Sequence, residues 1–276
     1  MTLQEKFKEL EKEGMALLAT NFYNYETLTG VLKAAQTTGF PIILQTSPST
    51  IDYLGIDVAV ALARSALKKH NVQGWLHLDH AHSYDLIKKC LDAGYDSVMI
   101  DASEKSFFEN IEITSRVTDL AKKYGANVEA ELGYVAKLGQ AQEKESGFTD
   151  PDEAKSFVDQ TGVDALAVAI GSAHGFYKAE PNLDLDRLAK IDQATSAALV
   201  LHGGSGIPNL QIQKSIQLGI RKINLATEIK DMFMNTLQKD LKNNEEIDLR
   251  KIFPSAIETV NQLVQEKLCM INQPHT

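Results

Sequence analysis

The chain alternates between short apolar segments and longer amphipathic ones, and this pattern restricts its fold more than any other feature. The short runs are Ala16–Asn21, Pro41–Gln45, Gly74–Asp79, Ser97–Asp101, Asn127–Glu131, Ala165–Ile170, Ala198–His202 and Lys222–Leu225. Each run is followed by a polar turn and then by apolar residues at helical spacing. Near-continuous apolar strands are typical of a parallel sheet that is buried on both faces. The pattern therefore predicts eight β-then-α units.

The helical patterns lie between these runs, and two longer ones close the chain. They are Tyr25–Thr37, Asp57–Lys69, Tyr84–Ala93, Phe107–Lys123, Pro151–Gln160, Leu185–Ala194, Leu210–Gln217, Glu228–Lys242 and Leu249–Leu268. The alternative fold, an open doubly wound sheet, places G-x-G-x-x-G after its first strand, but Thr20-Asn21-Phe22-Tyr23-Asn24 contains no glycine. We therefore predict one α/β domain over residues 1–276, a (β/α)₈ TIM barrel with extra terminal helices.

Charge and hydropathy restrict the partners of the protein. The net charge of −9 argues against a nucleic-acid partner, because binding to a phosphate backbone needs a basic surface. No apolar run is long enough to span a bilayer, and Met1–Glu13 has the pattern of a charged amphipathic helix rather than of a signal peptide. We therefore expect a cytoplasmic protein that binds neither nucleic acid nor membrane.

Polar residues close the predicted strands, where a doubly buried strand has no structural need for them. These residues are Asn21, Gln45, Asp79, His80, Asp101, Glu131, His202 and Asn224, with His174 shortly after the sixth strand. In a (β/α)₈ barrel the carboxyl ends of all strands meet at the face that carries the chemistry. A lone histidine there is usually a hydrogen-bonded loop residue, but His80, His174 and His202 come from three different units. Three protein ligands and an open position are typical of catalytic zinc, so these histidines are the predicted metal ligands.

The carboxylates at the strand ends allow two interpretations each. Asp79, beside His80, could remove a proton from a metal-bound substrate, or it could orient a zinc-bound imidazole. Asp101 and Glu131 could supply oxygen ligands at a second metal position, or could accept hydrogen bonds from the first set of ligands.

Two glycine-rich or helix-opening segments predict a phosphate site. His202-Gly203-Gly204-Ser205-Gly206 follows the seventh strand, and Asn224-Leu225-Ala226-Thr227 closes the eighth strand and opens a helix. The loops after these two strands are the usual phosphate site of this architecture. Glycines let backbone N–H groups approach an anion, and a helix N-terminus adds favourable potential.

At these residues the chain resembles the class II, zinc-dependent fructose-bisphosphate and tagatose-bisphosphate aldolases, from Ala19 to about Lys230. The matching motifs are Leu76-His77-Leu78-Asp79-His80, Ser97-Val98-Met99-Ile100-Asp101, Val128-Glu129-Ala130-Glu131-Leu132-Gly133, Ala169-Ile170-Gly171-Ser172-Ala173-His174-Gly175, Leu201-His202-Gly203-Gly204-Ser205-Gly206 and Asn224-Leu225-Ala226-Thr227-Glu228. Together they are specific, although no single one would be.

The resemblance implies reversible cleavage of a phosphorylated ketose to dihydroxyacetone phosphate and an aldehyde. It implies Zn²⁺ on His80, His174 and His202, with Asp79 exchanging the C3 proton of dihydroxyacetone phosphate. Asp101 and Glu131 would lie at a second metal position or behind the ligands, and Asn21 would contact substrate. The phosphate-binding residues would be Gly175, Gly203, Gly204, Ser205, Asn224, Leu225, Ala226 and Thr227, with Gly175 and Gly203 also offering carbonyls to a monovalent cation, Na⁺ or K⁺. A homodimer or homotetramer is also expected.

The chain departs from the family pattern on the aldehyde side. The family usually has phenylalanine at Thr20 and glycine at Ala102. The loop after Gly133 lacks the usual Gly-Gly pair and Glu-Asp, so Glu143 or Glu145 would have to supply its acid. No arginine can be assigned to bind a phosphate group on the aldehyde. Lys137 and the Ser47-Pro48-Ser49-Thr50 stretch are the candidates for this contact. The sequence pattern therefore does not identify the aldehyde.

Two rival functions remain on the same fold. A Schiff-base aldolase needs a lysine at the barrel mouth, and no predicted strand ends in lysine. A catalytically silent phosphate-binding barrel could act as a regulatory subunit of a partner aldolase. Asp79 and the three histidines argue against a protein without catalytic activity, whereas the altered loop after Gly133 favours one.

Overall fold

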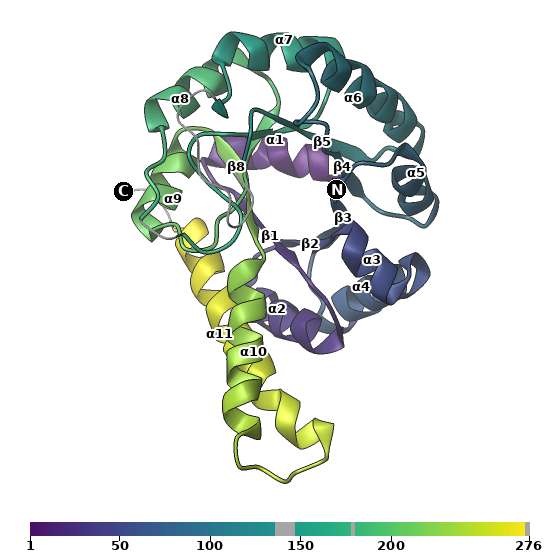
Figure 1. Ribbon diagram of the computed structural model, residues 1–276, viewed down its shortest axis with the longest axis vertical. Coiled ribbons are helices and arrows are strands. Elements are labelled where there is room, and N and C mark those ends of the chain that lie inside the picture. The colour runs from purple at the N-terminus through teal and green to yellow at the C-terminus, as the bar shows by residue number, and fades with distance from the viewer. Residues whose placement is uncertain (136–146, 178–179, 274–276) are drawn as a thin grey trace.

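The computed structural model describes residues 1–135, 147–177 and 180–273. Its strands form a closed parallel barrel in which neighbours in sequence are neighbours in space, and β8 pairs with β1 (Figure 1). The strands are β1 (Leu17–Asn21), β2 (Ile42–Thr46), β3 (Gly74–Ala81), β4 (Ser97–Ile100), β5 (Asn127–Leu132), β6 (Ala165–Val168), β7 (Ala198–Leu201) and β8 (Ile220–Leu225). The predicted (β/α)₈ barrel is confirmed.

Helices surround the barrel and extend the chain at both ends (Figure 1). They are α1 (Leu3–Glu13), α2 (Tyr25–Thr38), α3 (Pro48–Leu54), α4 (Ile56–His70), α5 (Tyr84–Asp92), α6 (Phe107–Ala121), α7 (Pro151–Thr161), α8 (Leu185–Ala194), α9 (Asn209–Gln217), α10 (Thr227–Leu241) and α11 (Leu249–Ile271). A 3₁₀ turn, η1 (Lys122–Tyr124), follows α6. The sequence pattern does not predict the short helix α3, which begins where Ser47 Oγ accepts a hydrogen bond from the Thr50 amide.

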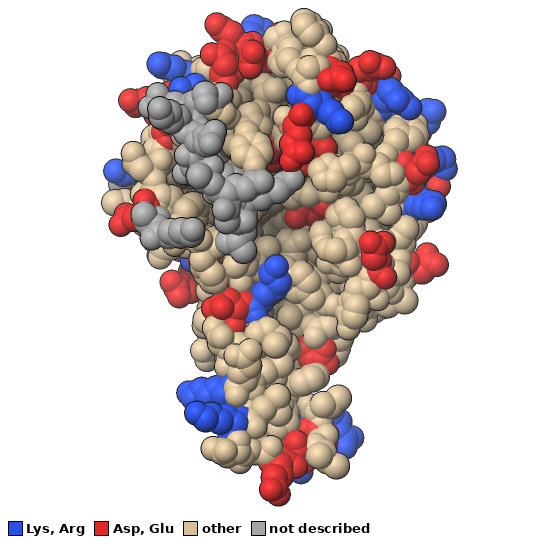
Figure 2. Space-filling model, in the orientation of Figure 1, with Lys and Arg blue, Asp and Glu red and all other residues tan. Residues whose placement is uncertain are grey.

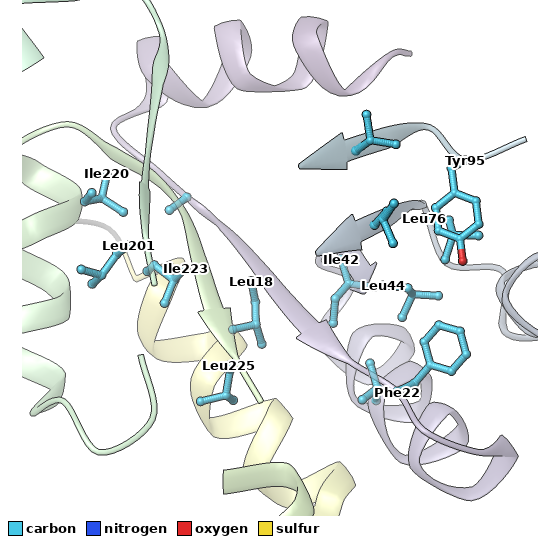
Figure 3. Packing of buried hydrophobic residues seen from close by; sticks show 14 of the residues in the cluster. Leu18, Phe22, Ile42, Leu44, Leu76, Tyr95, Leu201, Ile220, Ile223 and Leu225 are labelled. Carbon is cyan, nitrogen blue, oxygen red and sulfur yellow. The ribbon is translucent and has the colours of Figure 1, made fainter. Parts of the chain in front are cut away.

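Side chains along the strands alternate between an outer apolar layer and the interior of the barrel. Leu18 and Ile42 point outward into the layer between the strands and the helices (Figure 3). Leu17 and Ile43 belong to a smaller cluster inside the barrel, with Leu3, Phe7 and Leu10 of α1. Helix α1 therefore closes the amino-terminal end of the barrel, which leaves the carboxyl ends of the strands as the open face.

Helices α10 and α11 form a hairpin that projects away from the barrel (Figure 1). Helix α11 packs against α2 and α10. Its tip carries exposed apolar side chains, Leu241, Ile247 and Leu249, of which Ile247 is 91% exposed. Among the helices described, none combines the length and apolar composition that crossing a membrane would require.

Candidate active site

An irregularity near the end of β3 places two adjacent residues at the open face. The β3–β4 pairing shifts register between Leu78 and Ala81, and His80 adopts a left-handed backbone with φ of 50°. In a regular strand Asp79 and His80 would point to opposite faces of the sheet. A bulge re-aims side chains in this way, so both residues lie at the barrel mouth.

Three imidazole rings meet at this mouth, as the sequence predicts for a metal centre. The ring centroid of His80 lies 4.8 Å from that of His174 and 4.7 Å from that of His202. His80 Nε2 and His202 Nδ1 are 2.9 Å apart. One nitrogen from each of the three residues falls within 4.8 Å of the others. The barrel therefore brings together residues that are up to 122 positions apart in sequence.

Carboxylates fix which nitrogen each of two rings presents. His80 Nδ1 lies 2.9 Å from Asp101 Oδ2, which leaves Nε2 facing the cluster. His202 Nε2 lies 2.8 Å from Glu129 Oε1, which leaves Nδ1 facing it. Such carboxylate–histidine pairs hold metal-binding imidazoles in one tautomer and orientation. Asp101 itself accepts hydrogen bonds from the backbone and hydroxyl of Ser103.

The donor set fits Zn²⁺. Two nitrogen ligands of a tetrahedral zinc, each about 2.0–2.1 Å from the metal, lie about 3.3 Å apart, close to the observed 2.9 Å between His80 Nε2 and His202 Nδ1. The three histidines, one in β3, one in the loop after β6 and one directly after β7, offer the three nitrogen donors that catalytic zinc commonly takes. His80, Asp101 and Glu131 form a second group of ligand atoms within the same spacing.

Burial and mutual proximity set the protonation of these groups. Burial opposes the charged form of His80, but Asp79, Asp101 and Glu131 outweigh it and raise its pKa to about 9. Burial, together with the charge of His80, lowers the pKa of His202 well below its usual value. Burial also raises the pKa of Glu131 to about 8. The metal-free cluster thus holds protons that a bound cation would displace.

Asp79 is held at the mouth by two amides. Asn21 Nδ2 donates to Asp79 Oδ2 over 3.4 Å, and Asn224 Nδ2 donates to Asp79 Oδ1 over 3.3 Å. Its side chain is 8% exposed. Burial, together with the charge of Asp79, raises the pKa of Tyr23. Figure 2 shows acidic side chains within the hollow at this face. Asn21 therefore contacts the candidate base, and the amide of Asn224 faces Asp79.

Glycines in the loop after β7 allow close backbone approach. Gly203 has φ of 67°, and a Cβ there would lie 2.2 Å from the Ala173 carbonyl oxygen. The Gly204 amide donates to Asn224 O over 2.9 Å, which joins this loop to the end of β8. The two predicted phosphate-binding segments are therefore adjacent.

Helix α10 begins beside this loop without a side-chain cap. Ala226 occupies the capping position and makes no side-chain hydrogen bond. The first amides of a helix have no intrahelical acceptor, so those of Thr227 and Ile229, on either side of Glu228, face the place where an anion could bind. Ser205 Oγ accepts a hydrogen bond from the Glu228 amide over 3.3 Å, which ties the loop to the helix.

Tyr177 joins the loops after β6 and β7. Its hydroxyl accepts a hydrogen bond from the Ala173 amide and donates to the Gly203 carbonyl, both over 2.8 Å. The carbonyl expected to face a monovalent cation is thus already bonded to a hydroxyl. Gly175, the other residue expected there, has φ of 94° in the same turn.

The remaining histidines and loop acids lie apart from the imidazole cluster or outside the described chain. His77 is buried inside the barrel with Nδ1 2.7 Å from Ser97 Oγ, and His70 Nδ1 contacts Gln36 Oε1 over 3.0 Å. His82 Nδ1 contacts the Asp101 carbonyl over 2.7 Å. Lys137, Glu143, Glu145 and His275 lie outside the described residues.

Three charged residues at or below the site are absent from the sequence prediction. Glu129, two residues before Glu131 in β5, faces the same interior and contacts His202. Because side chains two residues apart in a strand share a face, its spacing from Glu131 could have identified it. Lys222 Nζ lies 2.6 Å from Glu129 Oε2, and both side chains are 1% exposed. Lys230 in α10 places its ammonium 5.5 Å from the ring centroid of Tyr23. The position of Lys222 within a strand indicates that it has a buried partner, but the sequence does not identify that partner.

Comparison with known proteins gives one consistent result. A family model described as class-II fructose-bisphosphate aldolase matches residues 1–275. A Helicobacter pylori protein named fructose-bisphosphate aldolase is 35% identical over 288 residues, with 94% of each chain covered. The crystal structure of the YdjI aldolase from Escherichia coli K12 has a TM-score of 0.87 at 30% identity, covering 99% of this chain and 98% of that one. The fructose-bisphosphate aldolase of Campylobacter jejuni shares the fold, with a TM-score of 0.83 at 22% identity over 98% and 94% of the chains.

Proposed function

We propose, from the premise that this chain belongs to the class II fructose-bisphosphate aldolase family and is an aldehyde-lyase, that it reversibly cleaves a phosphorylated ketose to dihydroxyacetone phosphate and an aldehyde. Fructose or tagatose 1,6-bisphosphate, or a related ketose 1-phosphate, is the proposed substrate. The observation that carries this proposal is the position of the Asp79 carboxylate, bonded to two amides beside three converging imidazoles.

His80, His174 and His202 are the residues that would hold Zn²⁺, which when bound supplies a Lewis acid that polarises the substrate carbonyl. Asp79 would accept the C3 proton of dihydroxyacetone phosphate and return it in the reverse direction. Asn21 and Asn224 keep its carboxylate in place through their amides.

Gly203 and Ser205, with the start of α10, would bind the phosphate through backbone and hydroxyl donors, and Gly204, whose amide donates to the Asn224 carbonyl, would let the backbone approach it closely. The uncapped helix start and the glycine backbone support this assignment. Asp101 supports the metal ligands through its contact with His80, and Glu131 lies 3.7 Å from His202 Nδ1, within reach of a second metal position. We also propose that a monovalent cation, Na⁺ or K⁺, binds at the carbonyls of Gly175 and Gly203, where the second lone pair of the Gly203 oxygen would serve it beside the bond from Tyr177.

Chelation tests the metal. A strong chelator is expected to abolish cleavage, and added Zn²⁺ or Co²⁺ to restore it, because the metal held by the three histidines would supply the Lewis acid for the substrate carbonyl. His80 has a pKa of about 9 and is protonated below that pH, so zinc must displace its proton to bind. The apparent affinity for zinc should therefore fall as the pH is lowered from 9. Elemental analysis and metal titration at several pH values measure both effects. Full activity in protein shown to be metal-free would exclude the mechanism, and His174→Ala should lose both metal and turnover.

The aldehyde is proposed to carry an anionic group. Lys230 supports this, since its ammonium stands over Tyr23 near the mouth, and no ion pair with a carboxylate is seen for it in the described part of the chain. A panel of aldehydes offered with dihydroxyacetone phosphate should favour glyceraldehyde 3-phosphate over glyceraldehyde. Lys230→Met should reduce that preference by about tenfold, a loss expected for one charge contact. If phosphorylated and neutral acceptors react equally in wild type, another class of ketose 1-phosphate is the substrate.

We propose that the protein forms a homodimer or homotetramer through the α10–α11 hairpin. Its tip carries Leu241, Ile247 and Leu249, more apolar surface than a solvated hairpin needs. Light scattering should give at least twice the monomer mass at micromolar concentration. Ile247→Glu should shift that mass toward monomer, whereas a wild-type reading of monomer alone would contradict the assembly.

The silent regulatory subunit is not favoured. A subunit without chemistry has no need for a carboxylate held by Asn21 and Asn224 beside three imidazoles. Proton exchange at C3 of dihydroxyacetone phosphate, measured without any partner protein, distinguishes the two functions.

A further inference from the structure

A buried ion pair lies beside the proposed phosphate loop. Glu228, in the first turn of α10, accepts a hydrogen bond on Oε1 from the Gly206 amide over 2.6 Å. Its own amide donates to Ser205 Oγ. The carboxylate therefore links the end of the loop to the start of the helix. Gly206 has φ of 82°, a left-handed backbone that favours glycine, and a Cβ there would lie 3.3 Å from the Tyr177 ring.

The second oxygen of Glu228 faces a lysine from the last helix. Lys267 Nζ of α11 lies 3.2 Å from Glu228 Oε2, and the two side chains are 10% and 14% exposed. The contact is a close ion pair without hydrogen-bond geometry at Oε2. Lysine is rarely this buried without a specific partner. A residue 39 positions downstream thus reaches Glu228, the side chain that holds the Gly206 amide.

The charges explain why a lysine is needed there. A carboxylate beside a phosphate site repels the phosphate, and this repulsion is strong where water is largely excluded. Glu228 holds the Gly206 amide, but unpaired it would weaken anion binding at the adjacent donors. The ammonium of Lys267 cancels that charge while the hydrogen bond to Gly206 remains.

We propose that Glu228 and Lys267 are positioning residues for the phosphate-binding loop. Glu228 sets the loop against α10, and Lys267 removes the electrostatic penalty of having a carboxylate there. The C-terminal helix α11 thereby determines how tightly the substrate phosphate binds. This inference rests on the phosphate site of the proposed function.

The test combines single and double variants in C3 proton exchange with dihydroxyacetone phosphate. Lys267→Met should raise KM about ten- to a hundredfold, because the unpaired carboxylate repels the phosphate, while kcat changes less than about threefold. Lys267→Arg should stay near wild type. The double variant Lys267→Met/Glu228→Gln should recover most of the loss, because the amide oxygen still accepts from Gly206 and no unpaired charge remains.

The matched control is Lys251→Met on the same helix, which removes an exposed ion pair with Glu246 and should leave KM unchanged. Calorimetric titration with dihydroxyacetone phosphate reads the same affinity without turnover. An unchanged affinity in Lys267→Met, or a double variant as weak as the single one, would overturn the inference. If wild type binds dihydroxyacetone phosphate but exchanges no proton, the proposed function fails while the titration series still decides this inference.

Discussion

Replacing Asp79 by alanine is expected to abolish proton exchange at C3 of dihydroxyacetone phosphate while leaving the zinc content near that of wild type. The carboxylate accepts hydrogen bonds from Asn21 and Asn224, and it is not one of the three predicted metal ligands. A well-placed acid/base contributes roughly 10² to 10⁴ in rate, so the loss should fall in or above this range. Tritium or deuterium exchange measures the rate, and elemental analysis measures the metal.

Asp79→Asn is the shape-matched control. It keeps side-chain size but cannot accept the proton, so it should be about as inactive as alanine. Glu143 and Glu145 variants should spare the exchange and slow only carbon–carbon bond formation or cleavage. An Asp79→Ala protein that exchanges normally would remove this residue from the mechanism. An equal loss of zinc and exchange would instead indicate that Asp79 serves the metal.

Removing the buried charge of Lys222 is expected to destabilise the fold by about 3–5 kcal/mol, because Glu129 would be left as an unpaired charge inside the barrel. Lys222 Nζ lies 2.6 Å from Glu129 Oε2, and each of the two side chains is 1% exposed. Glu129 also holds His202, so Lys222→Met should weaken zinc binding too, by about 10- to 100-fold as for other changes behind metal ligands. Denaturant unfolding and zinc titration measure the two effects separately.

Two companion variants make this result specific. Lys222→Met with Glu129→Gln should recover much of the stability, since no unpaired charge remains. Lys88→Met removes an exposed ion pair with Asp92 at 2.7 Å, and should cost at most about 1 kcal/mol. If Lys222→Met were as mild as Lys88→Met, the pair would have no structural role.

Much of this architecture is already determined by local sequence. Eight apolar runs followed by helical spacing predict the barrel, because each pattern depends only on the few residues within one element. Asp150 and Pro151 likewise predict the start of α7, where the Asp150 side chain accepts from the amides of the first turn. The polar strand ends predict which face carries the site, because all parallel strands of a closed barrel end on that face.

The tertiary structure decided how the side chains pair. The bulge that turns His80 toward the mouth beside Asp79 arises from the β3–β4 pairing, which the β3 sequence alone does not specify. The partner of Lys222 is 93 residues away, and that of Lys267 is on another helix. A lone charged residue in an apolar segment shows that its burial needs a compensating charge, but only the packing of strands and helices brings Glu129 to Lys222 and Glu228 to Lys267. Sequence therefore determined the elements and the reactive residue types, whereas side-chain orientation and charge compensation depended on contacts that exist only once the strands and helices have packed together.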